Sequence, residues 1–121
     1  MREKILICDD EEDILQVVSI ILEKEGYEVT AINRVDNPIK LIKRHNPSLI
    51  LMDLWIPEIG GEEALKIIKE NPETAHIPIV LFSANNEIDG IAKRAEADGY
   101  IHKPFTIQHL KSYIGGFLTA D

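Results

Sequence analysis

Two hydrophobic periods alternate along the chain. Short apolar and β-branched runs predict five strands, at Lys4–Cys8, Tyr27–Ile32, Ser48–Met52, Ile77–Phe82 and Tyr100–His102. Three of these runs, KILIC, SLILM and IPIVLF, are almost continuously hydrophobic, which is typical of strands buried on both faces of a parallel sheet. Between the runs, apolar residues recur every three or four positions, as on the buried face of an amphipathic helix.

The helical patterns differ in strength. Three clear apolar stripes lie at 14–22, 64–68 and 107–118, and weaker helices are predicted at 36–45 and 86–95. Residues that commonly end helices follow the first three: Gly26, Asn46-Pro47 and Asn71-Pro72. Thr106 is a candidate N-cap for the last helix. The pair Gly115-Gly116 predicts that this last helix frays or ends nearby.

The alternation predicts one α/β domain. Five β–α units in 121 residues imply right-handed crossovers and a doubly wound parallel sheet with helices on both faces. The length suits a single domain spanning residues 1–121. In such sheets, ligands bind beyond the carboxyl ends of the strands.

Composition narrows the class of protein. With 13 Lys and Arg against 21 Asp and Glu, the net charge is −8, which disfavours a nucleic-acid-binding surface. The single cysteine, Cys8, permits no internal disulfide. The N-terminal segment has no signal-peptide hydrophobic region, and no apolar run approaches the ~20 residues of a membrane span. We therefore expect a cytoplasmic domain that binds neither nucleic acid nor membrane directly.

Chemically active side chains stand at the ends of four predicted strands. Asp9 and Asp10 follow the first strand, Asp53 the third, Ser83 the fourth and Lys103 the fifth. Each alone has an ordinary explanation, since an acid can complement the next helix and a serine can cap it. Together they would converge on one edge of the sheet, which is a much rarer coincidence.

This combination suits phosphoryl transfer. Three crowded carboxylates raise one another's pKa unless a cation compensates, and Mg²⁺ takes oxygen ligands from one or two carboxylates plus water. A carboxylate bound to Mg²⁺ beside a lysine and a hydroxyl is equipped to accept a phosphoryl group, because the cations neutralise its oxygens.

Four segments, ILICDDEEDI, LILMDLWIP, VLFSA and DGYIHKPF, resemble the signature segments of the response-regulator receiver domain of two-component signalling. The resemblance is to the chemotaxis-regulator type and covers essentially the whole chain. It implies a flavodoxin-like (βα)5 fold with strand order 2-1-3-4-5.

The resemblance also implies a role for each acidic residue. Asp53 matches the phosphoacceptor, which attacks the phosphohistidine of a sensor histidine kinase or phosphotransfer protein. Asp10 and Asp53 match direct Mg²⁺ ligands, joined by the backbone carbonyl of Trp55. Asp9 matches an acid that acts on the metal through water.

The remaining matches concern the switch. Lys103 matches the base that pairs with the phosphoryl group, and its bond to Pro104 is expected to be cis. Ser83 matches the switch hydroxyl, and Tyr100 the aromatic that turns inward when that hydroxyl moves. The face built from the fourth helix, the fifth strand and the fifth helix would then control an effector, an output domain or a homodimer. Such a domain catalyses only its own aspartyl phosphorylation and dephosphorylation.

Three positions depart from the commonest family pattern. Trp55 is bulky where a smaller residue is usual, and together with Asn85 it occupies the positions that tune phosphate lifetime in the family. Glu96 stands where the family usually has the glycine that ends the fourth helix, so we expect a different helix terminus there.

Other classes fit less well. A flavodoxin would need a first loop that cradles phosphate, and the DDEED loop would repel it. A haloacid-dehalogenase phosphatase needs a second aspartate two residues after the nucleophile, where this chain has Trp55. The serious alternative is a pseudo-receiver that docks partners without phosphorylation because Trp55 blocks the site.

Overall fold

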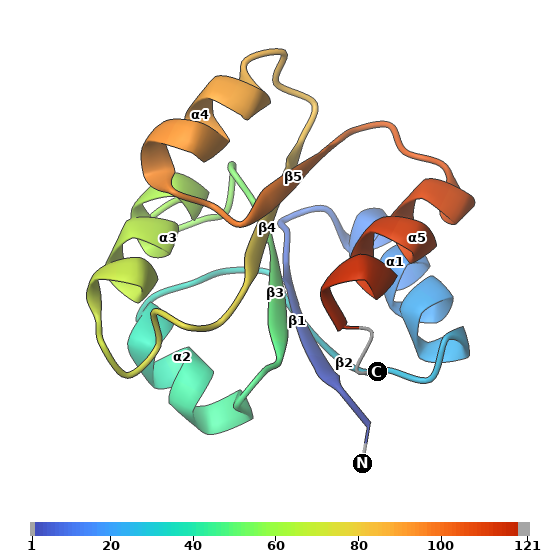
Figure 1. Ribbon diagram of the computed structural model, residues 1–121, viewed down its shortest axis with the longest axis horizontal. Coiled ribbons are helices and arrows are strands. Elements are labelled where there is room, and N and C mark those ends of the chain that lie inside the picture. Colours follow the sequence, from blue (N-terminus) through green and yellow to red (C-terminus); the bar gives the residue numbers. More distant parts are fainter. Residues whose placement is uncertain (1, 119–121) are drawn as a thin grey trace.

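The computed structural model describes residues 2–118 and contains a five-stranded parallel sheet in the order β2-β1-β3-β4-β5. The strands are β1 (Lys4–Cys8), β2 (Glu28–Ile32), β3 (Leu49–Asp53), β4 (Ile79–Ser83) and β5 (Gly99–His102). The helices are α1 (Glu12–Lys24), α2 (Pro38–His45), α3 (Gly61–Glu70), α4 (Ile88–Ala95) and α5 (Ile107–Leu118). Helices α1 and α5 cover one face of the sheet, and α2, α3 and α4 cover the other (Figure 1). The predicted fold class and strand order are confirmed.

The sheet separates two hydrophobic cores. Strand β1 shows the division, because Ile5 and Ile7 pack in the core under α1 and α5, whereas Leu6 and Cys8 pack in the core under α2, α3 and α4. The central strands β1, β3 and β4 are buried on both faces, as their continuous hydrophobic runs predict. None of the helices within residues 2–118 is long and apolar enough to cross a membrane.

Two strands end later than the sequence pattern predicts. Strand β3 runs through Asp53 and β4 through Ser83, because both polar residues still pair in register, Asp53 with Phe82 and Ser83 with His102. The ladder of the sheet therefore holds both side chains, which do not lie on a loop.

The glycine pair Gly115-Gly116 does not interrupt the last helix. Helix α5 spans Ile107–Leu118, which is the extent of the predicted apolar stripe. Ile114 is buried and Phe117 packs against the same core, so tertiary contacts on both sides of the glycine pair outweigh its low helix propensity. At the other end, the Thr106 hydroxyl accepts a hydrogen bond from the backbone N–H of His109 at 2.9 Å, which confirms the predicted N-cap.

Helix α4 ends in an unusual way. Its C-cap residue, Glu96, has φ 62° and ψ 39°, in the left-handed region that favours glycine. The expected difference in backbone geometry is not found, because Glu96 adopts the left-handed conformation that glycine usually supplies and differs only in carrying a Cβ atom there.

Candidate functional site

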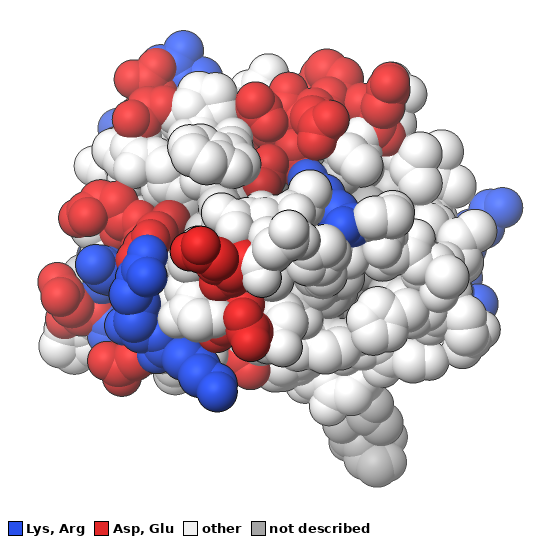
Figure 2. All heavy atoms as spheres, turned by 90° about the horizontal axis from the view of Figure 1, so that it is seen from above, with Lys and Arg blue, Asp and Glu red and all other residues white. Residues whose placement is uncertain are grey.

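An acidic cluster lies where β1 and β3 end. Asp9 and Asp53 are buried and Asp10 is exposed, and one carboxylate oxygen from each lies within 4.8 Å of the other two. Figure 2, which views this edge of the sheet, shows acidic side chains gathered next to a small basic patch. The topology thus brings together three acids that are separated by up to 44 positions in the chain, as the sequence pattern predicts.

Lys103 brings positive charge into this cluster from the end of β5. Its Nζ donates to Asp9 Oδ2 at 2.8 Å and to Glu11 Oε1 at 3.4 Å, and it lies 3.7 Å from Asp53 Oδ2. The ammonium also sits 4.7 Å from the centre of the Phe82 ring. Burial opposes the charge of Lys103, but the hydrogen bond to Asp9 and the charges of Asp53, Asp9 and Glu11 outweigh it and raise the lysine pKa. The peptide bond between Lys103 and Pro104 is cis, as expected.

The surroundings of Asp53 disfavour its ionisation and raise its pKa. Burial, followed by the charge of Asp9, raises its pKa from 3.8 to about 6. Lys103 and the backbone N–H of Trp55, which donates to Asp53 Oδ1 at 3.3 Å, act in the opposite direction. The charge on Asp53 is therefore incompletely compensated by the chain's own groups.

A cavity of about 350 Å³ opens over Asp53. Its lining residues come from the ends of four elements: Asp10, Glu11, Asp53, Trp55, Ser83, Ala84, Asn85 and Lys103. The Ser83 hydroxyl is buried and accepts a hydrogen bond from the N–H of Asn85 at 3.0 Å. The side chain of Trp55 is 71% exposed, so it stands at the rim and does not fill the cavity.

The loop that follows Asp53 folds back against it. The N–H of Gly61 donates to the Leu54 carbonyl at 3.0 Å, and a Cβ atom at Gly61 would overlap the Asp53 carbonyl oxygen. Only glycine permits so close an approach, which fixes the start of α3 beside the phosphoacceptor candidate.

A second contact ties this loop to the segment after β2. The N–H of Val35 donates to the Pro57 carbonyl at 3.3 Å, and Arg34 forms an ion pair with Glu58 at 3.0 Å. These contacts steady the far end of the loop that carries Trp55.

Tyr100 lies outside the cavity. It is on β5 with 40% of its surface exposed, and its backbone N–H donates to the Tyr113 hydroxyl at 3.1 Å. The structure therefore brings together Asp9, Asp10, Asp53, Ser83 and Lys103, and it places the side chain of Tyr100 on the surface.

The donor set fits a hard divalent cation. Three carboxylate oxygens within 4.8 Å of one another, one of them exposed, match the preference of Mg²⁺ for a few carboxylates and several waters. The raised pKa of Asp53 also indicates unmet demand for positive charge.

Sequence reasoning missed two residues of the site. Glu11 contacts Lys103, and its N–H donates to Asp9 Oδ1 at 2.8 Å, which fixes the orientation of that buried carboxylate. The acidic run after β1 indicates that an acid near Lys103 is available, but nothing in the sequence shows that Glu11 and not a neighbouring acid makes this contact. Gly61 had no signal in the sequence, because its close approach to Asp53 depends on how the loop folds back.

The fold and the site define an α/β domain with a cluster of three aspartates and a lysine at the carboxyl edge of its sheet, and comparison with known proteins identifies the family. The model of the response regulator receiver domain matches residues 5–115, so the chain belongs to the response-regulator receiver family of two-component signalling. The polar-differentiation response regulator DivK of Brucella ovis is 30% identical over 122 residues, which cover 95% of this chain and 98% of that protein.

Solved structures agree. The receiver domain of NtrX from Brucella abortus is 30% identical with a TM-score of 0.85, covering 97% of this chain and 99% of that chain. The chemotaxis response regulator CheY4 of Vibrio cholerae is 25% identical with a TM-score of 0.85, covering 98% of this chain and 100% of that chain.

Proposed function

We propose that this receiver domain is a phosphorylation-dependent switch whose phosphoacceptor is Asp53. A carboxylate oxygen of Asp53 attacks the phosphorus of a phosphohistidine on a sensor histidine kinase or phosphotransfer protein. The new O–P bond forms as the P–N bond breaks, and the leaving imidazole takes up a proton. The observation that carries the proposal is the position of Asp53, buried at the end of β3 beside Lys103 and open to a cavity of about 350 Å³.

Asp10, Asp53 and the backbone carbonyl of Trp55 would hold Mg²⁺, with Asp9 acting through water. When bound, Mg²⁺ supplies positive charge to the phosphoryl oxygens. This assignment is supported by the proximity of the three carboxylates and by the fit of their oxygens to a hard cation.

Lys103 and Ser83 would stabilise the transferred group. Lys103 already lies 3.7 Å from Asp53 Oδ2, so its ammonium needs little movement to pair with a phosphoryl oxygen on that carboxylate. The Ser83 hydroxyl lines the same cavity and would donate to a second oxygen. Both groups offset the charge that the phosphoryl group adds.

The switch would pass from Ser83 to Tyr100. Movement of the Ser83 hydroxyl toward the phosphoryl group would leave space for the exposed Tyr100 ring to turn inward. This shifts an existing equilibrium of the α4-β5-α5 face, which would control a downstream effector, an output domain or a homodimer in the cytoplasm. Trp55 and Asn85, both at the cavity, would set the lifetime of the aspartyl phosphate.

The proposal is tested by incubating the protein with Mg²⁺ and acetyl phosphate, a small phosphodonor, and measuring the intact mass. One added phosphoryl group on the wild type and none on Asp53→Asn supports it. An equal adduct on both proteins contradicts the assignment of Asp53. An unmodified wild type that also fails to bind beryllofluoride would favour the pseudo-receiver function, although the exposure of Trp55 argues against a blocked site.

A further inference from the structure

One edge of the sheet is open. Within the described residues β2 pairs only with β1, and the pairing is parallel. The N–H of Glu28 donates to the Glu3 carbonyl, and the Ile32 carbonyl accepts from the N–H of Asp9. Because backbone direction alternates along a strand, the N–H and C=O groups of Val29, Ala31 and Asn33 point away from the sheet. They form a row of unpaired donors and acceptors.

The other edge strand of the sheet, β5, differs from β2 because one of its outward backbone groups has a partner. On β5, the N–H of Lys103 donates to the Ser83 carbonyl, so the N–H of Tyr100 points outward. That outward N–H donates to the Tyr113 hydroxyl at 3.1 Å. A side chain from α5 therefore occupies an outward N–H of β5, whereas the outward N–H and C=O groups of β2 remain free to pair with another strand.

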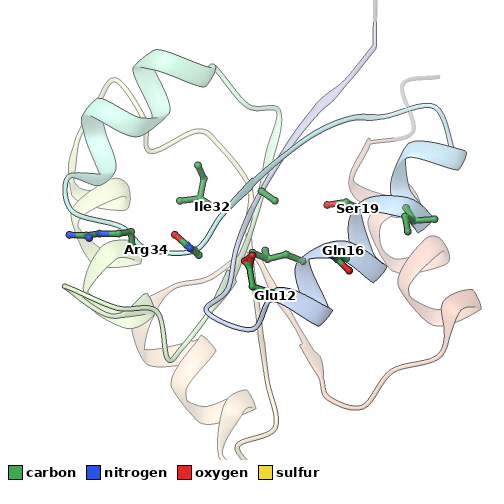
Figure 3. A pocket seen from close by; sticks show the side chains of 9 residues that line it. Glu12, Gln16, Ser19, Ile32 and Arg34 are labelled. Atoms are coloured by element: carbon green, nitrogen blue, oxygen red, sulfur yellow. The ribbon is translucent and has the colours of Figure 1, made fainter.

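A groove of about 710 Å³ runs along the open edge. Figure 3 shows Glu12, Gln16 and Ser19 of α1 along one side and Arg34 on the far side of the strand. The rest of the lining is mainly apolar and comes from both faces of β2 and from α1: Leu15, Ile20, Ala31, Ile32 and Asn33. The groove thus crosses the strand edge, which gives room for a further strand and pockets for alternate side chains.

We propose that β2 is a docking edge for an extended segment of a partner protein, which adds to the sheet as a sixth strand. The segment would place apolar side chains against Leu15 and Ile20 of the groove. It would carry basic residues at its ends, because Glu12, Glu23 and Glu28 lie on α1 and β2 and none of them has an ion pair among residues 2–118. Arg34, by contrast, is already paired with Asp36 and Glu58.

A second copy of the chain is the less suitable occupant. Each copy carries a net charge of −8, and pairing β2 with β2 would bring the two α1 helices, with their unpaired glutamates, onto the same side of the joined sheet. A separate, basic segment meets the same backbone groups without this repulsion.

The probe for the test is a labelled peptide, acetyl-Lys-Lys-Val-Thr-Val-Thr-Val-Lys-Lys-amide, followed by fluorescence anisotropy against the full chain. Two N-methylated isomers provide the critical comparison, one blocked at the valine N–H groups and one at the threonine N–H groups. Alternate N–H groups of an extended peptide lie on opposite edges, so only one edge faces β2. One isomer should bind at least tenfold more weakly than the unmodified peptide, and the other should bind with similar affinity.

The matched protein variants are Ala31→Pro and Ala31→Ser. Proline removes one outward N–H and leaves the β1–β2 ladder intact, whereas serine keeps that N–H, so only the proline variant should weaken binding, by roughly fivefold or more. A peptide with glutamate in place of lysine should bind at least tenfold more weakly at low salt, with the difference shrinking at high salt.

Three results would overturn the proposal. One is equal affinity of the two N-methylated isomers for the wild-type protein. This comparison does not depend on whether a protein variant folds. Another is absence of peptide binding up to about 1 mM. The third is a dimer, seen by sedimentation, that Ala31→Pro dissociates and Ala31→Ser does not, because this would assign the edge to a second copy.

Discussion

At Asp53, burial and the neighbouring charge of Asp9 act against ionisation, whereas Lys103 and the Trp55 amide act in favour of it. The carboxyl pKa of about 6 shows that the first pair of effects dominates. In the role that we propose for Asp53, a bound cation would act twice. It would favour the ionised carboxylate, and it would offset the added charge once the carboxylate carries a phosphoryl group.

This residue makes stability depend on pH in a defined direction. Since the pKa is raised from 3.8 to about 6, the folded protein binds more protons than the unfolded chain between these values. The contribution of Asp53 to the free energy of unfolding therefore falls as pH rises through this window. Without Mg²⁺ at pH 7.5, Asp53→Asn should be more stable than the wild type by about 1–2 kcal/mol, and the difference should fade toward pH 4.

Urea unfolding at several pH values measures this difference. Excess Mg²⁺ serves as the control, because it should stabilise the wild type more than Asp53→Asn and so reduce or reverse the gap. A variant that is less stable than the wild type at pH 7.5 without Mg²⁺ would show that Asp53 is not under electrostatic strain.

The loop between β3 and α3 depends on one glycine. A Cβ atom at Gly61 would overlap the Asp53 carbonyl oxygen, and the three nearest atoms all belong to the backbone of Asp53 and Leu54, so no flexible side chain can move aside. Gly61→Ala should therefore lower the free energy of unfolding by several kcal/mol and slow phosphorylation of Asp53 by shifting its position. Chemical unfolding and the rate of acetyl-phosphate labelling measure both effects.

Gly90→Ala is the matched control. Gly90 lies inside α4 with nothing within 4 Å of its Cβ direction, so alanine there should raise the free energy of unfolding by roughly 0.5–1 kcal/mol. Similar effects of the two substitutions would mean that the close approach at Gly61 is unimportant.

Helix α4 offers a second test at this scale. Glu96 holds a left-handed conformation with φ 62°. Glu96→Gly should raise the free energy of unfolding by about 1 kcal/mol, because glycine adopts this conformation without steric cost. Glu96→Ala keeps the Cβ atom and should bring no such gain. Thermal and urea unfolding of the two variants distinguish the backbone effect from loss of the glutamate charge.

Across the whole molecule, the sequence was sufficient for the fold and for most of the site. Continuous hydrophobic strands require a sheet covered on both faces, and parallel strands bring their carboxyl ends to one edge, so the convergence of Asp10, Asp53 and Lys103 follows from the order of elements. Long-range side-chain contacts carry no such pattern. The hydrogen bond from the Tyr100 N–H to the Tyr113 hydroxyl and the ion pair between Arg34 and Glu58 are examples. Both depend on how the elements pack, which the hydrophobic pattern of the sequence does not predict.

The central claim is that Asp53 itself carries the phosphoryl group. Borohydride reduction of the protein after incubation with Mg²⁺ and acetyl phosphate, followed by mass spectrometry of its peptides, tests this most directly, since reduction converts an aspartyl phosphate into homoserine. We predict homoserine at position 53 in the wild type, a marked decrease in Lys103→Met, and aspartate retained at positions 9 and 10. Homoserine at position 9 or 10, with position 53 unchanged, would contradict the account.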